Sequence, residues 1–265
     1  MKKRFFPYYI AFVLAVMYAP IVLVIVYSFN QGRLSSVWGG FTLSWYAELA
    51  RDRSMFEALR NSLTLALLTS LSSAVLGTLG ASGMARRSAW KPAARAGGAV
   101  MEYLSILPVM TPEIILGMTF LAFFSLLGLP FGMFTLVIAH TAFCVPYVYL
   151  LVRARLAGLD KSYAEAARVM GAGGVRAFYD ITLPLTLPAV VSGMLISFAM
   201  SFDDVIVSVF VAGVHTNTLP LKIYSQIKTG VTPKINAMCA LIFVLTVFLC
   251  LAAAILARKQ KRRES

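Results

Sequence analysis

The sequence predicts an all-α protein that crosses a membrane several times, and two observations lead to this fold class. Hydrophobic residues make up 59% of the 265-residue chain and charged residues only 13%, whereas about a quarter of an ordinary soluble domain is charged. The apolar residues also occur in long runs, and about 20 such residues are enough to cross the hydrocarbon core of a bilayer. Because backbone groups inside lipid must be hydrogen-bonded within the protein, these runs are expected to be helices.

Six runs predict six transmembrane helices in one transmembrane domain that covers residues 1–265. We place the helices at residues 5–29, 59–85, 100–127, 131–152, 187–212 and 235–257. The first run follows basic residues, as in a secretory signal peptide. It is longer than the apolar part of such a peptide, and no small-residue cleavage site is obvious after it. We therefore interpret this run as a retained membrane anchor.

The placement of the basic residues predicts the orientation. The formal net charge is +13, which on its own would also suit a nucleic-acid-binding protein. The basic residues, however, gather before the first helix, between the second and third, after the fourth and at the end of the chain. These places lie on one side of the membrane if the helices alternate. Since cytoplasmic segments are rich in Lys and Arg, both termini are expected in the cytoplasm, and nucleic-acid binding is disfavoured.

The second helix carries a face of small residues. Gly77, Ala81 and Ala85 recur at four-residue spacing, and Gly80 and Gly83 lie beside them. Small residues allow two helix backbones to approach closely. We expect this face to pack within the chain, and packing against a second subunit is the alternative.

The third and fourth helices contain polar groups within apolar sequence. Glu113 follows the second of two kinking prolines in the third helix and shares a face with Phe120. In the fourth helix, His140 and Tyr147 lie on one face. We interpret His140 as a hydrogen-bonded residue of the helix packing, with a proton relay as the alternative.

The fifth helix carries a polar stripe. Ser197, Ser201, Asp204 and Ser208 stand at i, i+4, i+7 and i+11, on one face of a continuous helix. Asp203 is adjacent and points about 100° away. An ionised acid that faces lipid costs several kcal/mol, so the stripe should face the bundle interior or a water-filled path. We favour the path, and Asp204 more than Asp203. A buried carboxylate satisfied by neighbouring hydroxyls is the alternative.

The charges inside the apolar runs favour a cationic solute. Acidic and aromatic side chains occur there, whereas no Lys or Arg lies deep within any of the six runs. Carboxylates pair with ammonium groups, and aromatic faces attract them. We predict neither catalytic residues nor a cofactor or metal site. The residues expected to line the path are Asp204, Asp203, Glu113, Ser201, Phe120 and Tyr147.

A charged stretch over residues 160–186 separates the fourth and fifth helices. Residues 163–168 are good helix formers, and Asp160 or Ser162 is suited to cap their start. Glycines from Gly171 onwards then break this helix. On physical grounds alone the stretch is either an interfacial helix that joins two spans or a docking surface for a partner.

The residues of this stretch resemble the EAA loop of ATP-binding-cassette (ABC) importer permeases. The resemblance rests on Glu165-Ala166-Ala167, on Gly171, and on Leu183-Pro184 followed by Pro188. It implies the type I importer permease fold, with residues 160–186 as coupling helices that fit a groove on a cytoplasmic ATPase. It assigns Glu165, Ala166 and Gly171 to the ATPase contact.

Further segments resemble the permeases of spermidine/putrescine importers, most closely their second permease subunit. These segments include residues 27–30, 45–46, 201–205 and 219–220. The resemblance implies a permease subunit of an ATP-driven polyamine importer in the bacterial inner membrane. It also implies a second permease subunit in a heterodimer, two cytoplasmic ATP-binding subunits and an external substrate-binding protein.

This chain itself is not expected to be an enzyme. It contains no G-x-x-x-x-G-K-[ST] phosphate-binding loop, so ATP hydrolysis is expected on a separate subunit. Two alternatives stay open. One is an ABC importer permease for another small, cationic solute. The other is a stand-alone secondary transporter in which His140, Asp203 and Asp204 form an ion relay.

Overall fold

The computed structural model describes nearly all of the chain as helix. The described residues are 2–32, 37–85, 100, 102–103, 105–160, 162–163, 169–214, 216–228 and 230–261, and side chains are described between residues 7 and 248 of these ranges. Within this part of the chain, β-structure is limited to a single bridge between Asn30 and Phe41. The predicted all-α class is therefore confirmed. The chain divides into two compact units, Met1–Met55 with Ile223–Ser265, and Phe56–Lys222.

The first unit contains α1 (Lys2–Tyr27), α2 (Ser44–Arg51) and α12 (Pro233–Lys261), and α12 packs against both other helices. The turn after α1 is fixed by Asn30, whose fully buried amide donates to Val37 O and accepts from Gly39 N–H, both at 2.7 Å. Trp45 of α2 donates its indole N–H to Asn30 O at 2.7 Å. The side chain and the carbonyl of Asn30 thus join the end of α1 to the start of α2.

An ion-pair cluster joins α2 to the start of α12. Lys234 Nζ lies 2.8 Å from Glu48 Oε1 and 3.0 Å from Asp52 Oδ2. Partial burial alone would lower the pKa of Lys234, but the hydrogen bonds and charges of the two carboxylates outweigh it and raise the pKa above its ordinary value. The three side chains are partly exposed, so their attraction is screened by water.

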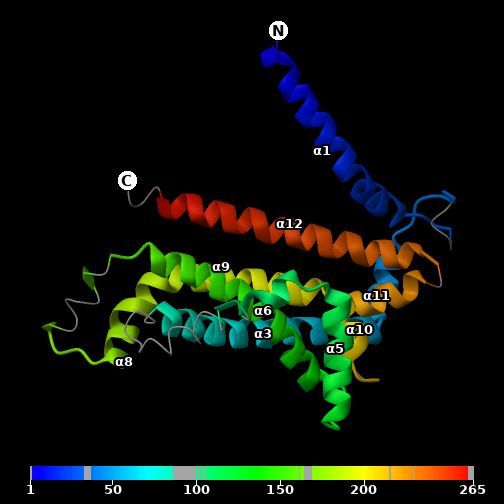
Figure 1. The fold of residues 1–265 in the computed structure, drawn as a ribbon. Helices are drawn as coiled ribbons and strands as arrows, with labels where there is room; N and C mark the ends of the chain where they lie inside the picture. Colours follow the sequence, from blue (N-terminus) through cyan, green and yellow to red (C-terminus); the bar gives the residue numbers. More distant parts are fainter. Residues whose placement is uncertain are drawn as a thin grey trace. The chain divides into compact units, whose positions relative to one another are not determined.

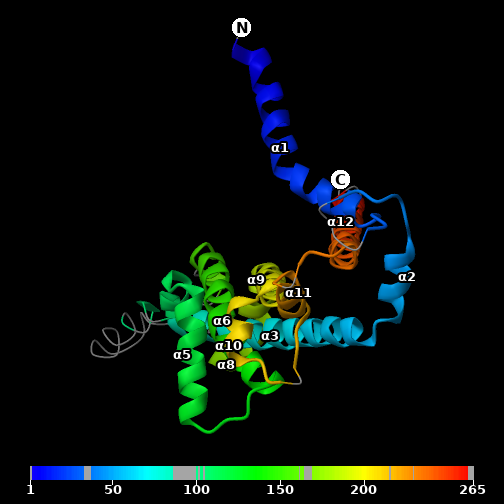
Figure 2. The ribbon, with the colours of Figure 1, turned by 90° about the vertical axis from the view of Figure 1, so that its right-hand side faces the viewer.

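The second unit is built on three helices, α3 (Arg53–Ala85, which starts just before the unit), α6 (Met133–Ala157) and α9 (Leu183–Asp203). α6 and α9 lie side by side (Figure 1). α3 joins them through a core that includes Ala81, Val148 and Val190. The shorter helices α5 (Glu113–Leu126) and α10 (Ile206–Val211) pack against each other beside α6 (Figure 2).

Two glycines bring the three long helices together at Val148 of α6. A Cβ atom added at Gly77 of α3 would lie 2.8 Å from Val148 Cβ, and one added at Gly193 of α9 would lie 3.0 Å from Val148 Cα. Only glycine permits both approaches. The predicted packing of small residues within the chain is thus confirmed at Gly77 and Ala81, whereas Gly83 has no neighbour within 4 Å of an added Cβ.

Four described helices are long and apolar enough to cross a membrane: Pro7–Tyr27, Arg53–Ala85, Met133–Ala157 and Gly174–Asp203. Two shorter apolar helices, Glu113–Leu126 and Pro233–Phe248, fall in the third and sixth predicted runs. The total of six spans stays a prediction.

The third run differs from the single kinked helix expected over residues 100–127. Residues 105–110 are helical, the helix stops before Pro112, and α5 starts at Glu113. Pro112 has φ −54° and ψ 132°, an extended conformation. The residue before a proline is disfavoured in the helical region and proline donates no amide hydrogen bond, which together explain a break rather than a kink.

The fifth predicted helix starts earlier in the chain than expected and ends earlier as well. α8 (Gly174–Ala177), a π-helical turn (Phe178–Thr182) and α9 follow one another without a gap, so that helix is continuous from Gly174 to Asp203. Asp204 is extended, with ψ 131°, and α10 starts two residues later. The single helix predicted over residues 187–212 is therefore broken.

Candidate functional site

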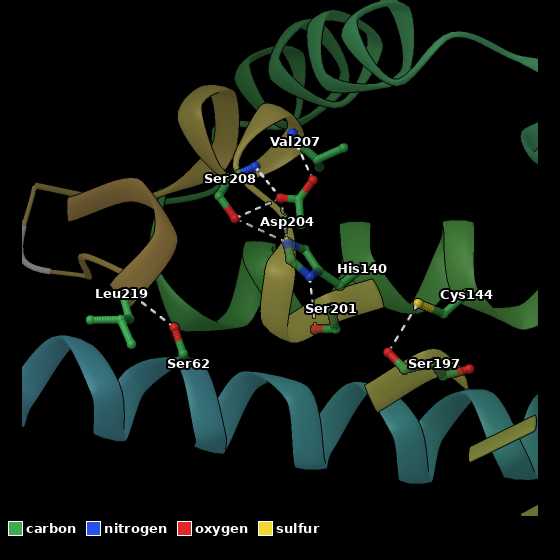
Figure 3. Close-up of polar contacts among 9 residues, drawn as sticks. All are labelled: Ser62, His140, Cys144, Ser197, Ser201, Asp204, Val207, Ser208 and Leu219. Atoms are coloured by element: carbon green, nitrogen blue, oxygen red, sulfur yellow. Dashed lines mark hydrogen bonds and ion pairs between the residues drawn. The ribbon is translucent and has the colours of Figure 1, made fainter. Parts of the chain in front are cut away.

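The break between α9 and α10 is held by the side chain of Asp204. Its Oδ1 accepts a hydrogen bond from Val207 N–H at 3.2 Å, and its Oδ2 accepts from Ser208 N–H and Ser208 Oγ, both at 2.8 Å (Figure 3). The first amides of a helix have no carbonyl partners within that helix. The carboxylate supplies these partners and places negative charge where the helix dipole favours it. Asp204 therefore caps α10 from within the bundle.

His140 of α6 completes the network around the break. Its Nε2 lies 3.4 Å from Asp204 Oδ2 and 3.3 Å from Ser208 Oγ, and its Nδ1 lies 2.9 Å from Ser201 Oγ (Figure 3). The imidazole is fully buried, and the Asp204 side chain is only 5% exposed. The prediction that His140 is a hydrogen-bonded residue of the helix packing is confirmed.

Three acidic side chains meet at a cavity beside this break. The cavity has a volume of about 360 Å³, and Glu113, Asp203 and Asp204 contribute to its lining. A smaller space of about 60 Å³ is lined by Glu113, Asp204 and Tyr147, among other residues. Glu113 and Asp203 are exposed, in contrast to Asp204. Neither lining, as far as the structure describes the chain, contains Lys or Arg.

A comparison with protein families shows to which family the chain belongs. The family described as "Binding-protein-dependent transport system inner membrane component" matches residues 84–264, which is more than half of the chain. The chain belongs to this family. The permease described above is thus an inner-membrane component of a transport system, as the sequence resemblance implies.

Two curated relatives match almost the whole permease. It is 38% identical over 247 residues to the spermidine/putrescine transport system permease protein PotC of Haemophilus influenzae, covering 93% of this chain and 94% of the relative. It is 36% identical over 254 residues to the putrescine transport system permease protein PotI of Escherichia coli, covering 93% and 89%.

Solved structures support the fold of the permease. A chain of a bacterial ABC transporter involved in the import of the acidic polysaccharide alginate matches with a TM-score of 0.71 at 17% identity, covering 97% of both chains. A chain of the MetNI methionine ABC transporter matches with a TM-score of 0.61 at 17% identity, covering 80% of this chain and 95% of that chain. The predicted ABC importer permease fold is confirmed.

The structure brings together four of the six residues predicted to line the path. Glu113, Asp203, Asp204 and Tyr147 all lie on one or both cavities of the permease. The other two predicted residues line neither cavity. Ser201 is buried against His140, and Phe120 stacks on Phe124 with ring centroids 5.8 Å apart, beside the apolar core.

The predicted ATPase contact is described only in part. Glu165 and Ala166 lie outside the described residues. Gly171 has φ +81° and no atom within 4 Å of an added Cβ, a backbone conformation that favours glycine. The side chains of Val169 and Met170, just before it, are 89% and 87% exposed. Apolar side chains as exposed as these are available to a partner.

The break itself and its histidine partner were not foreseen from the sequence. A signal is nevertheless present, because Asp204 is followed by the β-branched residues Val205, Ile206 and Val207 and then by Ser208. Asp competes with helical hydrogen bonding by bonding to nearby backbone amides, and β-branched residues are weaker helix formers. Together these tendencies favour an Asp-capped restart of the helix over a continuous span.

Proposed function

We propose that this permease is the membrane subunit of an ATP-driven polyamine importer, and that the cavity beside the α9–α10 break is part of the polyamine path. The observation that carries the proposal is the meeting of Glu113, Asp203 and Asp204 at one cavity whose described lining lacks basic side chains. A polyamine carries several ammonium groups, which need successive anionic partners as they leave water. The polyamine systems of the two curated relatives support this choice of solute.

The acids at the cavity have different tasks in this proposal. Glu113 and Asp203 are exposed and offer their carboxylates to the ammonium groups. Asp204 already accepts hydrogen bonds from Val207 and Ser208 and lies near His140. It contributes negative charge to the cavity but acts mainly through the shape of the break. Tyr147, on the smaller space, offers an aromatic face to a cation.

The proposed assembly contains partners that supply the energy and deliver the solute. It consists of this chain, a second and different permease subunit, two cytoplasmic ATP-binding subunits and an external substrate-binding protein. ATP is hydrolysed on the separate subunits. Both termini and the coupling loop at residues 160–186 face the cytoplasm, which the placement of the basic residues supports. Glu165, Ala166 and Gly171 contact the ATPase in this arrangement.

Uptake by the complete transporter tests the solute. The transporter, reconstituted with its binding protein, is expected to import labelled putrescine or spermidine in the presence of ATP, and not a neutral sugar or sulfate. Asp203→Asn and Glu113→Gln should each raise the KM for the polyamine, because each removes one exposed negative charge. ATP-driven import of another small cation, without import of polyamines, would show that the proposed solute is wrong. Transport by this chain without ATP would overturn the whole proposal.

The ATPase contact is tested separately. Glu165→Ala should reduce co-purification of the ATP-binding subunits and abolish uptake, while the permease still inserts into the membrane. Glu57→Ala is the control, because Glu57 is an exposed acid of α3 outside residues 160–186; it should leave co-purification and uptake normal. Normal uptake by Glu165→Ala would contradict the assignment.

A further inference from the structure

We propose that His140 is the positioning residue of this cavity: it holds Asp204 so that the broken helix turns Asp203 towards the solute. The inference rests on the proposed function, because it deepens the account of the same cavity. The role differs from the ion relay considered from the sequence, because His140 here transfers no ion and acts only by holding Asp204.

The break determines which of the two neighbouring aspartates meets the cavity as an exposed group. Asp203 is the last residue of α9 and is exposed, whereas Asp204 is extended, 5% exposed and turned inwards (Figure 3). If α9 continued through Asp204, the amides of Val207 and Ser208 would take carbonyl partners four residues earlier. The Asp204 carboxylate would then lose these two amide donors. The inward position of Asp204 and the broken backbone therefore depend on each other.

His140 spans the break from a neighbouring helix. One ring nitrogen, Nδ1, contacts Ser201 before the break, and the other, Nε2, reaches Asp204 and Ser208, at and after it. α6 is also held against α3 at Val148, eight residues beyond His140 and away from the break, so His140 is anchored independently of residues 204–208. Removing the Nε2 contact would leave Asp204 without a partner from outside its own segment among the contacts described.

A neutral imidazole satisfies every contact in this network. Nε2–H donates towards Asp204 Oδ2 and Ser208 Oγ, while the Ser201 hydroxyl donates to Nδ1; this tautomer is assigned from the hydrogen-bond partners. Ser208 Oγ–H donates to the same Asp204 oxygen. The carboxylate is thus fixed by donors on two elements, α6 and α10. A group held in this way keeps its geometry when the solute passes.

Two substitutions of His140 test the roles of its two ring nitrogens separately. The amide nitrogen of Gln is three bonds from Cβ, like Nε2, and that of Asn is two bonds from Cβ, like Nδ1. His140→Gln therefore keeps a donor for Asp204 and loses the Ser201 contact, whereas His140→Asn keeps a group near Ser201 and loses Asp204. If His140 acts through Asp204, His140→Gln should retain a KM near that of the wild type. His140→Asn should raise the KM for the polyamine by about tenfold, as expected for one lost hydrogen bond to a charged group.

The control for a mere packing defect is Cys144→Ala, one turn along the same face of α6. Cys144 is fully buried and donates to Ser197 O at 3.6 Å, so its described hydrogen bond goes to the backbone of α9 and not to the Asp204 carboxylate (Figure 3). Its truncation should leave the KM unchanged. Equal KM values for His140→Gln and His140→Asn, whether normal or raised, would overturn the positioning role.

A second readout works without any assumption about the solute. Asp203→Cys in the complete transporter should react with a cationic thiol reagent. The wild-type transporter, which keeps Asp203, measures the background reaction of the native cysteines. Adding His140→Gln should preserve the reaction rate, and adding His140→Asn should lower it by about tenfold. Equal rates in the two double variants contradict the positioning role. Failure of the wild-type transporter to import polyamines would instead remove the proposed function, and the labelling rates would still decide the role of His140.

Discussion

The meeting of α3, α6 and α9 at Val148 makes Gly77→Ala a sharp test of the structure. The new Cβ would lie 2.8 Å from Val148 Cβ and 3.0 Å from Tyr149 N. Both distances are shorter than ordinary van der Waals contact, and the second neighbour is backbone. Val148 cannot move away freely, because Gly193 of α9 also lies close to it: a Cβ added there would be 3.0 Å from Val148 Cα. The helices must therefore separate or shift.

The expected size of the effect follows from two opposing terms. Overpacking a tight core costs about 1–3 kcal/mol, while replacing Gly by Ala within a helix favours the helix by about 1 kcal/mol. Gly83→Ala, on the same helix, keeps only the favourable term because nothing lies within 4 Å of its added Cβ. The gap in stability between the two variants should therefore be about 1–3 kcal/mol, with Gly77→Ala the less stable.

Thermal unfolding of the purified transporter in detergent measures this gap. One kcal/mol shifts the midpoint of a domain of this size by roughly 2–4 °C, so Gly77→Ala should unfold about 2–12 °C below Gly83→Ala. Gly83→Ala should match or exceed the wild type. Equal midpoints for the two variants would refute the close approach of α3 and α6 at Val148.

Three further outcomes are expected. Asp204→Ala should lower the stability of the transporter in thermal unfolding by about 1–3 kcal/mol, because it uncaps α10 and leaves buried amides unpaired. In the same assay, Asp203→Asn should leave the unfolding midpoint unchanged. Uptake titrations of the double variant Glu113→Gln/Asp203→Asn should give a higher KM than either single variant. Lys234→Met should cost no more than about 1 kcal/mol. Since the pKa of Lys234 is raised, the stability that its charge contributes is complete below the ordinary lysine value of 10.5 and is lost as the pH rises through the raised pKa. The unfolding midpoints of the wild type and Lys234→Met should therefore converge only in strong alkali. A difference in midpoint that persists there would contradict the ion pairs.

Several features of the fold were accessible from the sequence because the bilayer imposes them. A run of apolar residues must satisfy its own backbone, so its identification as helix needs no tertiary information. The close approach at Gly77 was also foreseeable, because a helix with small residues at four-residue spacing has a face that admits another backbone.

The site was harder to predict for two physical reasons. Phe120 shares a helical face with Glu113 in sequence spacing, yet it stacks on Phe124 beside the core. A helix that is apolar all round gives no amphipathic signal of which side meets a cavity. The break at Asp204 depends on a side chain that replaces backbone partners and on His140 from another helix. The spacing of residues along one helix cannot show the contact with His140, and only the residue types that follow Asp204 indicate the capped restart of the helix.

The unbroken helix from Gly174 to Asp203 has a mechanical consequence. Its 30 residues form a rod about 45 Å long at 1.5 Å per residue. A tilt of about 5° about the Gly174 end would carry Asp203 sideways by about 4 Å, a displacement comparable to the width of an ammonium group with its contacts. The π-helical turn at Phe178–Thr182 lies near the amino-terminal end of this rod and interrupts its regular α-helical winding. A small angular movement at the amino-terminal end of the rod would thus be amplified into a larger displacement of Asp203 at the cavity.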